Sequence, residues 1–137
     1  AKIKISDNIH IFGNVSLVEF NKLLQESSIV MLPLNTDAPA GLIVIFQAAS
    51  QQKTVITTST PVTKEYIDNE TGVLCENNID QFRKEIEYHL QHPDIARAKG
   101  KALYNKLRSE CSKELYTSKL YNILLHNENR ISHTCIL

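Results

Sequence analysis

Residues 28 to 57 read SIVMLPLNTDAPAGLIVIFQAASQQKTVIT. The apolar run at 28–32 ends at a proline and predicts a strand buried on both faces, and TVIT at 54–57 predicts a second buried strand. Between them, a proline-bearing loop leads to an apolar stretch at 41–51. This stretch predicts a helix, although its β-branched content also permits a strand. A strand, a helix and a strand in this order predict a βαβ unit of a parallel sheet.

The flanking segments continue the same alternation. Upstream, IHIF at 9–12 predicts a short strand, and Ser16 followed three residues later by Glu19 is a capping box that opens a helix over 16–26. Downstream, the residues predict a short helix at 62–67, a turn at 68–72 and a last strand at 73–75. Three helices follow, at about 79–92, 93–108 and 112–126, and the final ISHTCIL carries no clear signal. The expected fold class is therefore α/β, with a parallel sheet, flanking helices and a helical C-terminal tail.

Composition limits the function classes. The chain has 137 residues, which is the size of one domain, and 15 basic and 15 acidic residues give zero net charge, which argues against a nucleic-acid binder. The five histidines do not cluster at metal-binding spacing, so no metal site is predicted. The cysteines are odd in number and lack CxxC spacing, which favours reduced thiols over a disulfide framework: Cys75, Cys111 and Cys135. Walker, nucleophile-elbow and dinucleotide-binding glycine motifs do not occur in the sequence.

Parallel sheets bind ligands at the carboxyl ends of their strands, near helix N-termini. The loops at 13–16, 33–41, 58–62 and 75–79 are therefore the candidate site. Asp37 is the only charged residue of its loop, and the helix that Gly41 opens could bind an anion at its first turn. An ordinary turn capped by Asp37 is the alternative. Likewise, the hydroxyl-rich TTSTPV at 57–62 could bind a polar ligand or simply favour a turn.

The order of these stretches resembles the C-terminal, donor-binding half of a retaining glycosyltransferase of the GT-B architecture. The specific resemblance is to glycosyltransferase family four, the glycosyl transferases group 1. It covers about residues 9 to 92, and its most specific part is TPVTKEYIDNETGVLC, with Glu65, Asn69 and Thr71-Gly72. The other matching stretches are IHIFGNV, LVEFNKLLQESS, IVMLPL, GLIVIFQAAS and TVITT.

The resemblance implies a Rossmann-like sheet that binds a nucleotide-diphosphate sugar. Residues 1–92 would form part of this nucleotide-sugar-binding domain, and 93–137 would supply the C-terminal helices of the same domain. The activity implied is transfer of a hexosyl-type sugar to an acceptor with retained configuration. The family also implies polysaccharide or glycoconjugate synthesis, a cytoplasmic location that includes the inner face of the membrane, and no metal or other cofactor.

The resemblance also implies roles for the loop at 33–41 and the helix after it. Asp37 and Ala40 lie in the loop that would face the donor sugar. The amides of Gly41 and Leu42 would face the sugar and the diphosphate. Gln47 falls where the family has a glutamate that holds the ribose hydroxyls. It is also the one polar residue in an otherwise apolar stretch, so a partnered core glutamine or an exposed one is the alternative.

Two further loops receive roles from the same resemblance. Thr60, Pro61 and Val62 would lie near the diphosphate. Gly13 and Val15 would border the nucleobase; for Gly13, an ordinary strand-to-helix turn is the alternative, since glycine suits both. No catalytic residue is assigned within this chain.

The sequence departs from the family pattern in three ways. The paired glutamates are not intact, because Pro39 stands eight residues before Gln47 and the nearest acid is Asp37. The basic pair that neutralises the leaving diphosphate has no match, since Lys2 and Lys4 are in the wrong place. The acceptor-binding half and the first strands of the donor domain are also lacking, so this fragment is expected to be inactive alone. Its strand edges must pair differently, recruit another chain through self-association, or stay exposed.

Other classes of function are weighed against this one. A non-catalytic α/β interaction or regulatory domain of the receiver type needs clustered acids, whereas Asp7 and Asp37 are isolated. A related GT-B enzyme of another chemistry, such as an epimerase or a phosphorylase-like enzyme, is the third alternative. A phosphorylase needs a lysine for pyridoxal phosphate, and Lys53 and Lys64 lack supporting context. The partners that the resemblance implies are a nucleotide-diphosphate sugar and an acceptor glycan or lipid bound through the other half, and no nucleic acid is expected.

Overall fold

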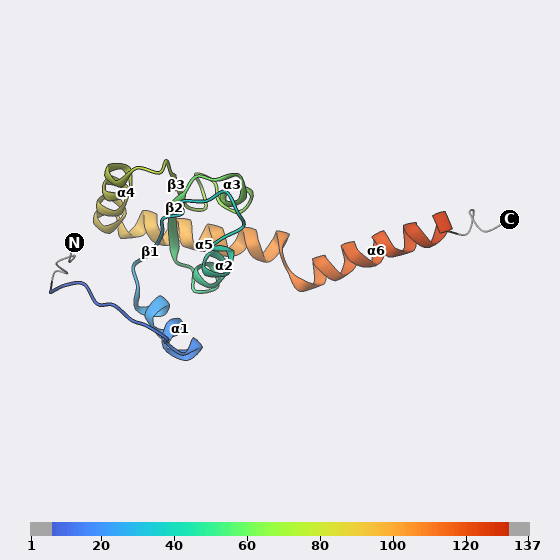
Figure 1. Cartoon of the computed structure of the whole chain (residues 1–137), viewed down its shortest axis with the longest axis horizontal. Coiled ribbons are helices and arrows are strands. Elements are labelled where there is room, and N and C mark those ends of the chain that lie inside the picture. Colours follow the sequence, from blue (N-terminus) through green and yellow to red (C-terminus); the bar gives the residue numbers. More distant parts are fainter. Residues whose placement is uncertain (1–6, 132–137) are drawn as a thin grey trace.

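The computed structural model describes residues 7–131. The elements are, in order, α1 (Leu17–Glu26), β1 (Ile29–Leu32), α2 (Leu42–Ser50), β2 (Thr54–Thr58), α3 (Pro61–Tyr66), β3 (Val73–Cys75), α4 (Ile79–Gln91), α5 (Pro93–Glu110) and α6 (Lys113–Ile131). The strands form one parallel sheet in the order β1-β2-β3. Figure 1 shows α5 running alongside the sheet and α6 extending away from it. The predicted fold class is confirmed: a Rossmann-like α/β arrangement with a helical C-terminal region.

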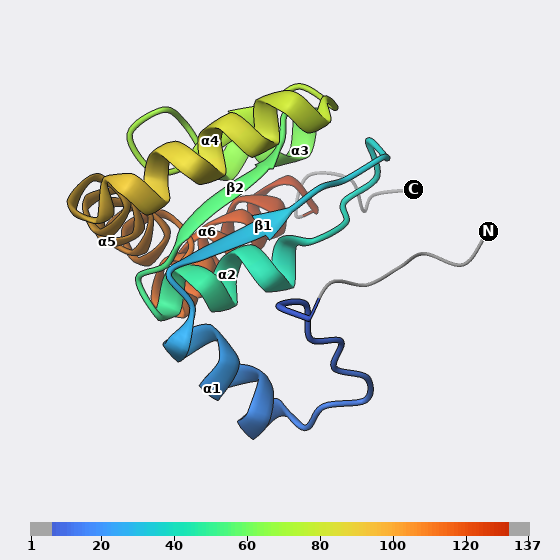
Figure 2. The ribbon, with the colours of Figure 1, turned by 90° about the vertical axis from the view of Figure 1, so that its left-hand side faces the viewer.

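The sheet lies between two layers of helix because successive strand residues face opposite sides. In β2, Val55 packs in a cluster with Ile45 of α2 and Leu103 of α5. The next residue, Ile56, packs on the other face against Phe82 of α4. Figure 2 shows α2 and α4 on opposite sides of the strands. All five residues of β2 are buried, as the sequence predicts.

Local sequence signals set the helix starts. The Ser16 hydroxyl accepts a hydrogen bond from the Glu19 amide at 3.2 Å, and the Glu19 carboxylate accepts one from the Ser16 amide at 2.8 Å, which confirms the capping box. At α4, the Asn78 side chain accepts from the Asp80 amide at 2.8 Å. Pro93 stands in the first turn of α5, where a missing N–H costs nothing. The predicted helices are all present, although α6 continues past the predicted end at 126 to Ile131.

The predicted strand at 9–12 is wrong. Ile9, Ile11 and Phe12 are 56%, 74% and 61% exposed, and the segment has no regular secondary structure. Figure 2 shows the chain before α1 running apart from the sheet. A strand needs a hydrogen-bonding neighbour, and no strand among residues 7–131 pairs with this segment. Its β-type sequence alone therefore does not make it a strand.

The prediction that β1 is buried on both faces is wrong for one residue. Val30 is buried, but Met31 is 50% exposed. The cluster around Phe82 of α4 takes in Ile29 and Ile56 and leaves Met31 open. β1 is also the edge of the sheet, and its outer side carries no strand within the described chain. An exposed edge is one of the three outcomes expected from the sequence.

The last helix leaves many apolar side chains exposed. In α6, Tyr116, Leu120 and Leu124 are 67%, 42% and 56% exposed. Even so, no helix within residues 7–131 is long and apolar enough to cross a membrane.

Gly100 lets α5 lie directly on the chain that leads into β2. A methyl group at Gly100 would lie 2.1 Å from the carbonyl oxygen of Gln52 and 2.9 Å from the carbonyl carbon of Lys53. These are backbone atoms, so they cannot rotate aside. One turn earlier in α5, the carbonyl of Ala96 accepts a hydrogen bond from the Thr54 hydroxyl. The glycine inside this long helix is thus explained by close backbone contact.

Gly100→Ala should destabilise the fold. In an open helix the change would add about 1 kcal/mol of stability, but here the added methyl must push α5 from β2, and overpacking of this kind typically costs ~1–3 kcal/mol. Urea unfolding at 25 °C measures the difference. Asn105→Ala, an exposed site in the same helix, is the control and should change stability by less than about 0.5 kcal/mol. A Gly100→Ala protein as stable as the wild type would contradict this account of the contact.

Candidate functional site

A polar pocket lies where the three strands end. Its volume is about 260 Å³. It is lined by the last residue of β2 and by loop residues that follow β1, β2 and β3: Leu34, Asn35, Thr36, Asp37, Thr58, Ser59, Thr60, Glu76 and Asn77. Three of the four predicted loops, at 33–41, 58–62 and 75–79, therefore meet at the carboxyl edge of the sheet. This is the edge where parallel sheets bind ligands.

Hydrogen bonds between β1 and β2 hold the first wall of the pocket. The Thr57 hydroxyl donates to the carbonyl of Leu32 at 2.8 Å, and the amide of Leu34 donates to the Thr58 hydroxyl at 2.8 Å. Both threonines are buried. These hydrogen bonds hold the first residues of the loop after β1 against β2. The later residues of the loop, Asn35 to Asp37, line the pocket.

The loop after β3 is tied in the same way. The amide of Ser59 donates to the carbonyl of Cys75 at 2.7 Å. Across the pocket, the side-chain amide of Asn77 donates to the side-chain oxygen of Asn35 at 3.1 Å. The loops after β1 and β3 are therefore joined directly, and hydrogen bonds hold each of them in place beside the pocket.

Some of the hydroxyls predicted to meet a ligand are already engaged. The Thr60 hydroxyl caps α3 by accepting from the Thr63 amide at 3.1 Å, and the Thr63 hydroxyl donates to the carbonyl of Thr58 at 2.7 Å. Thr60 and Thr63 are both buried. The run TTSTPV thus follows the alternative reading in large part, since its threonines build a turn and a helix start.

The groups that remain in the pocket are hydroxyl, amide and carboxylate, together with the apolar Leu34. None of the nine lining residues is a lysine, arginine or histidine. In the part of the chain that the structure describes, no three His, Cys, Asp or Glu side chains group as metal ligands. Such a surface can hydrogen-bond a polyhydroxylated molecule, and it supplies no positive side chain for a phosphate.

Gly41 shapes the start of α2 beside this pocket. Its φ is 76°, in the left-handed region, and a methyl group there would lie 2.6 Å from a methyl carbon of Leu32. The position therefore needs glycine. No side chain caps α2, so the N–H groups of its first turn are open to a ligand. Ala40, Gly41 and Leu42 are half-buried and do not line the pocket itself.

The remaining predicted residues are spread around this region. Gln47 is half-buried in the middle of α2, and its side-chain amide makes no hydrogen bond with the described protein groups. Pro61 is exposed and Val62 half-buried in the first turn of α3. Gly13 and Val15 precede α1, and a methyl group at Gly13 would meet no atom within 4 Å. Of the ten predicted binding residues, the structure thus brings only Asp37 and Thr60 into the pocket.

Sequence reasoning did not single out the other pocket residues by name. Asn35 and Thr36 lie in the predicted loop at 33–41, and Ser59 lies in the loop at 58–62. Glu76 and Asn77 directly follow the strand at 73–75. The signal that could have found them is position: each comes within a few residues of a strand's carboxyl end.

The family model for glycosyl transferases group 1 matches residues 1–107 of the 137. The chain belongs to the glycosyl transferases group 1 family. The match includes the whole sheet and most of α5. Neither the curated proteins nor the solved structures contain a match.

A second pocket of this glycosyl transferases group 1 domain lies at the opposite edge of the sheet. It also measures about 260 Å³, and Lys53, His89 and Arg97 are among its lining residues. Its cations already have partners: Lys53 donates to two backbone carbonyls at 2.7 and 2.8 Å, and Arg97 pairs with Asp94 at 2.6 Å. The Lys53 contacts join the chain before β1 to the turn before β2, and the Arg97–Asp94 pair lies within α5. His89 differs, because its buried Nε2 has no hydrogen-bond partner among the described residues.

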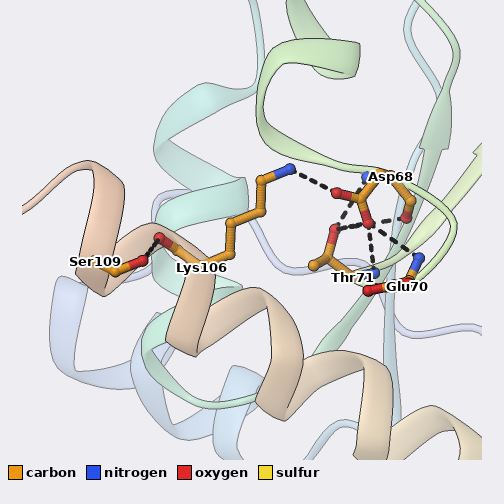
Figure 3. Close-up of polar contacts among 5 residues, drawn as sticks. All are labelled: Asp68, Glu70, Thr71, Lys106 and Ser109. Atoms are coloured by element: carbon orange, nitrogen blue, oxygen red, sulfur yellow. Dashed lines mark hydrogen bonds and ion pairs between the residues drawn. The ribbon is translucent and has the colours of Figure 1, made fainter.

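The segment DNETG at 68–72, which is part of the stretch TPVTKEYIDNETGVLC that most resembles the family, forms a turn at this same amino edge. The Asp68 carboxylate accepts hydrogen bonds from the amides of Glu70 and Thr71, each at 3.0 Å (Figure 3). Its second oxygen pairs with the ammonium group of Lys106 in α5 at 2.7 Å. Lys99 also donates to the carbonyls of Asn69 and Gly72. Two lysines of α5 thus hold the turn that leads into β3.

The Asp68–Lys106 pair makes a contribution to stability that depends on pH. The hydrogen bond from Lys106 is the largest cause that lowers the pKa of Asp68 from 3.8 to about 2. Because the folded pKa is the lower one, the stability is present above the unfolded pKa and is lost as pH falls toward the folded one. The Asp68 side chain is 50% exposed, so screening by water reduces the gain to about 1 kcal/mol.

Asp68→Asn should therefore lower the free energy of unfolding by about 1 kcal/mol at pH 7. Asparagine keeps an oxygen for the turn and removes only the charge that faces Lys106. The difference from wild type should shrink below about pH 4 and vanish near pH 2, which urea titrations across this range measure. Glu70→Gln, in the same turn, is the control and should show little effect. A difference that stays constant down to pH 2 would contradict the assignment.

Proposed function

We propose that this chain is the donor-binding part of a retaining glycosyltransferase that moves a sugar from a nucleotide-diphosphate sugar to an acceptor. The observation that carries the proposal is the convergence of three loops on a polar pocket at the carboxyl edge of the sheet. In a member of the glycosyl transferases group 1, this edge is where a nucleotide-sugar is expected to bind. The pocket's hydroxyl, amide and carboxylate groups suit the hydroxyls of a sugar.

The other parts of the donor are assigned to groups around the pocket. The first turn of α2, with no side-chain cap, would receive the diphosphate on its N–H groups, and the helix dipole would favour the anion by ~0.3–1 kcal/mol. Gln47, farther along the same helix, would hold the ribose hydroxyls. Thr60 to Val62 would lie near the diphosphate through the backbone of α3's first turn, and Gly13 and Val15 would close over the nucleobase.

Catalysis would come from stabilising the departing nucleoside diphosphate. No basic side chain lines the pocket. The N–H groups at the start of α2, and the family's basic pair, which has no match in this sequence, would therefore stabilise the negative charge of the diphosphate. We propose that no metal ion is required. A second, acceptor-binding domain of the GT-B type would bring a glycan or lipid acceptor, so this chain alone would be inactive.

The remaining features of the proposal are those that the resemblance to glycosyltransferase family four implies. The donor sugar would be of the hexosyl type, and the product a polysaccharide or glycoconjugate. The enzyme would act in the cytoplasm, including the inner face of the membrane. Residues 1–92 would be the nucleotide-sugar-binding part, and 93–137 the C-terminal helices of the same domain.

Titration with nucleotides tests the proposal. UDP, GDP and ADP and their common sugars are added to the ¹⁵N-labelled chain in the presence of EDTA, and amide shifts are followed by NMR. One of the three nucleotides, together with its sugars, should shift the amides of residues 34–47, 58–62 and 75–77. Uridine, guanosine and adenosine are controls and should bind weakly, because they lack the diphosphate. No shift with any nucleotide, or shifts confined to the pocket of Lys53 and Arg97, would overturn the proposal.

Gln47→Ala tests the ribose contact. Loss of one neutral hydrogen-bonding group should weaken nucleotide binding roughly fivefold, about 1 kcal/mol. Wild type should also prefer the ribonucleotide over its 2′-deoxy form, and the variant should lose this preference. Calorimetry measures both dissociation constants, with Gln51→Ala at the end of α2 as the matched control. An unchanged ribose preference in Gln47→Ala would exclude the contact.

A further inference from the structure

The pocket at the amino edge of the sheet holds a buried polar atom that lacks a partner in the described part of the chain. His89, near the end of α4, lines this pocket and is only 3% exposed. Its Nδ1 lies 2.8 Å from the carbonyl oxygen of Glu85, one turn earlier in the same helix. A carbonyl oxygen only accepts hydrogen bonds, so Nδ1 carries the hydrogen and donates it. The other ring nitrogen, Nε2, is buried and makes no hydrogen bond with a described residue.

This unpartnered nitrogen faces the pocket. Because Nδ1 is turned toward the backbone of α4, Nε2 at the far end of the ring points away from that helix. The space on that side is bordered by Ser28, Lys53 and Arg97 and has a volume of about 260 Å³. Buried polar side-chain atoms nearly always have a partner, which is the protein, a water or a ligand. Nε2 therefore indicates a binding position within this pocket.

The charges around the pocket favour an anion at that position. Lys53 donates to the carbonyls of Gln25 and Ser27, so its charge meets no acid there and its third N–H is left over. Arg97 donates to Asp94 through one nitrogen and keeps further N–H groups of its guanidinium. None of the ten residues that line the pocket is an aspartate or a glutamate.

The start of α5 adds to this preference. Pro93 and Ala96, both near the start of the helix, line the pocket, and no side chain caps the helix. The N–H groups and the dipole at a helix N-terminus attract anions. Donors thus reach the pocket from the turn before β2, from α4 and from α5. An anion with acceptor oxygens in several directions, such as a tetrahedral phosphate group, suits this arrangement better than a flat carboxylate.

We propose that the amino-edge pocket is a second ligand site, which binds a phosphate group through protonated His89, Lys53 and Arg97. When the anion binds, Nε2 of His89 takes up a proton from water and donates it in a hydrogen bond to a phosphate oxygen. The phosphate group is either inorganic phosphate or the end of a small phosphate ester, since both present the same oxygens. This site lies at the opposite edge from the proposed donor pocket and does not depend on the proposed function.

Protonation of His89 makes the binding depend on pH. From its own helix, the Glu85 carboxylate lies 3.7 Å from Nδ1 and favours the charged ring. From across the pocket, Lys53 and Arg97 disfavour the charged ring until an anion lies between them, and Asp94 offsets Arg97. Histidine is the side chain that ordinarily changes charge between pH 5 and 8. Affinity for an anion of constant charge should therefore fall as the pH rises from 6 to 8.

Other titratable groups near His89 do not produce the same dependence. Under α4, β1 and β2 contain no titratable residue. Burial raises the pKa of the Cys75 thiol of β3 to about 11, so this thiol stays neutral between pH 6 and 8. His92 stacks on Tyr88 and is exposed, but it does not line the pocket. His92 therefore provides a matched control.

Titration of the ¹⁵N-labelled chain with inorganic phosphate, at pH 7 in 0.15 M NaCl, tests the site by NMR. The ring-nitrogen signal of His89 Nε2 should change from that of a bare nitrogen to that of a protonated one. The amides of residues 27–28, 52–54 and 89–97 should shift with it. Glycerol 3-phosphate, titrated in the same way, distinguishes the sources: tighter binding of the ester indicates a larger ligand, and tighter binding of inorganic phosphate indicates the free anion. An Nε2 signal that neither anion changes would overturn the proposal.

A matched pair of variants in α5 separates a specific site from attraction by net charge. The Arg97 side chain is 75% exposed, so Arg97→Gln should fold, and it should weaken phosphate binding about threefold. Arg108→Gln makes the same charge change at an exposed position in the last turn of the helix and should leave the dissociation constant unchanged. Equal losses in the two variants would overturn the proposal.

The pH dependence is measured with sulfate, because its charge is constant between pH 6 and 8. His89→Gln should weaken sulfate binding about tenfold at pH 6, since a hydrogen bond from a charged donor is lost, and should remove the pH dependence. His92→Gln should keep it. A dependence that persists in His89→Gln, or that disappears in His92→Gln, would contradict the assignment. If His89→Gln does not fold, the Nε2 signal of the wild type and the Arg97 and Arg108 variants still decide the question.

Discussion

Complete burial of β2 is the constraint on which the rest of this structure depends. All five of its residues are buried, and three of them are threonines. A buried hydroxyl without a partner is costly, so each must find one. Thr54 donates to Ala96 of α5, Thr57 donates to Leu32 of β1, and Thr58 accepts from the loop after β1. The central strand thereby fixes α5 at one end and the loop that lines the pocket at the other.

The two edges of the sheet serve different purposes as a result. At the amino edge, basic side chains from the turn before β2 and from α5 bind backbone carbonyls or acids, as Lys53, Lys99 and Lys106 do. These interactions hold α5, the turn at 68–72 and the chain before β1 together. At the carboxyl edge, no basic side chain lines the pocket, and two acids face it without protein partners. The basic side chains of the amino edge are thus engaged within the fold, whereas the carboxyl edge keeps two carboxylates without protein partners among the described residues.

Most of the fold could be predicted because its signals are local. The capping box of Ser16 and Glu19, the proline that opens α5 and the run TVIT each act within a few residues. The strand expected at 9–12 has an equally good local pattern but lacks a neighbour to pair with, so it stays exposed. Met31 of β1 is exposed for a related reason, because the cluster around Phe82 of α4 includes Ile29 but not Met31.

The sequence by itself determined the order of the elements and the parallel sheet, and it predicted the edge at which a ligand would bind. It also determined the family, since residue order and type carry that information. Only the tertiary structure decided which residues of the candidate loops meet. Asp37 and Glu76, 39 positions apart, come to one pocket because the β1-β2-β3 order aligns three strand ends. The partners of the Thr57 and Thr58 hydroxyls were decided in the same way, since each binds a backbone group of the loop or strand end around β1, about 25 positions away. The Thr60 hydroxyl differs, because it caps α3 through the amide of Thr63, only three residues on.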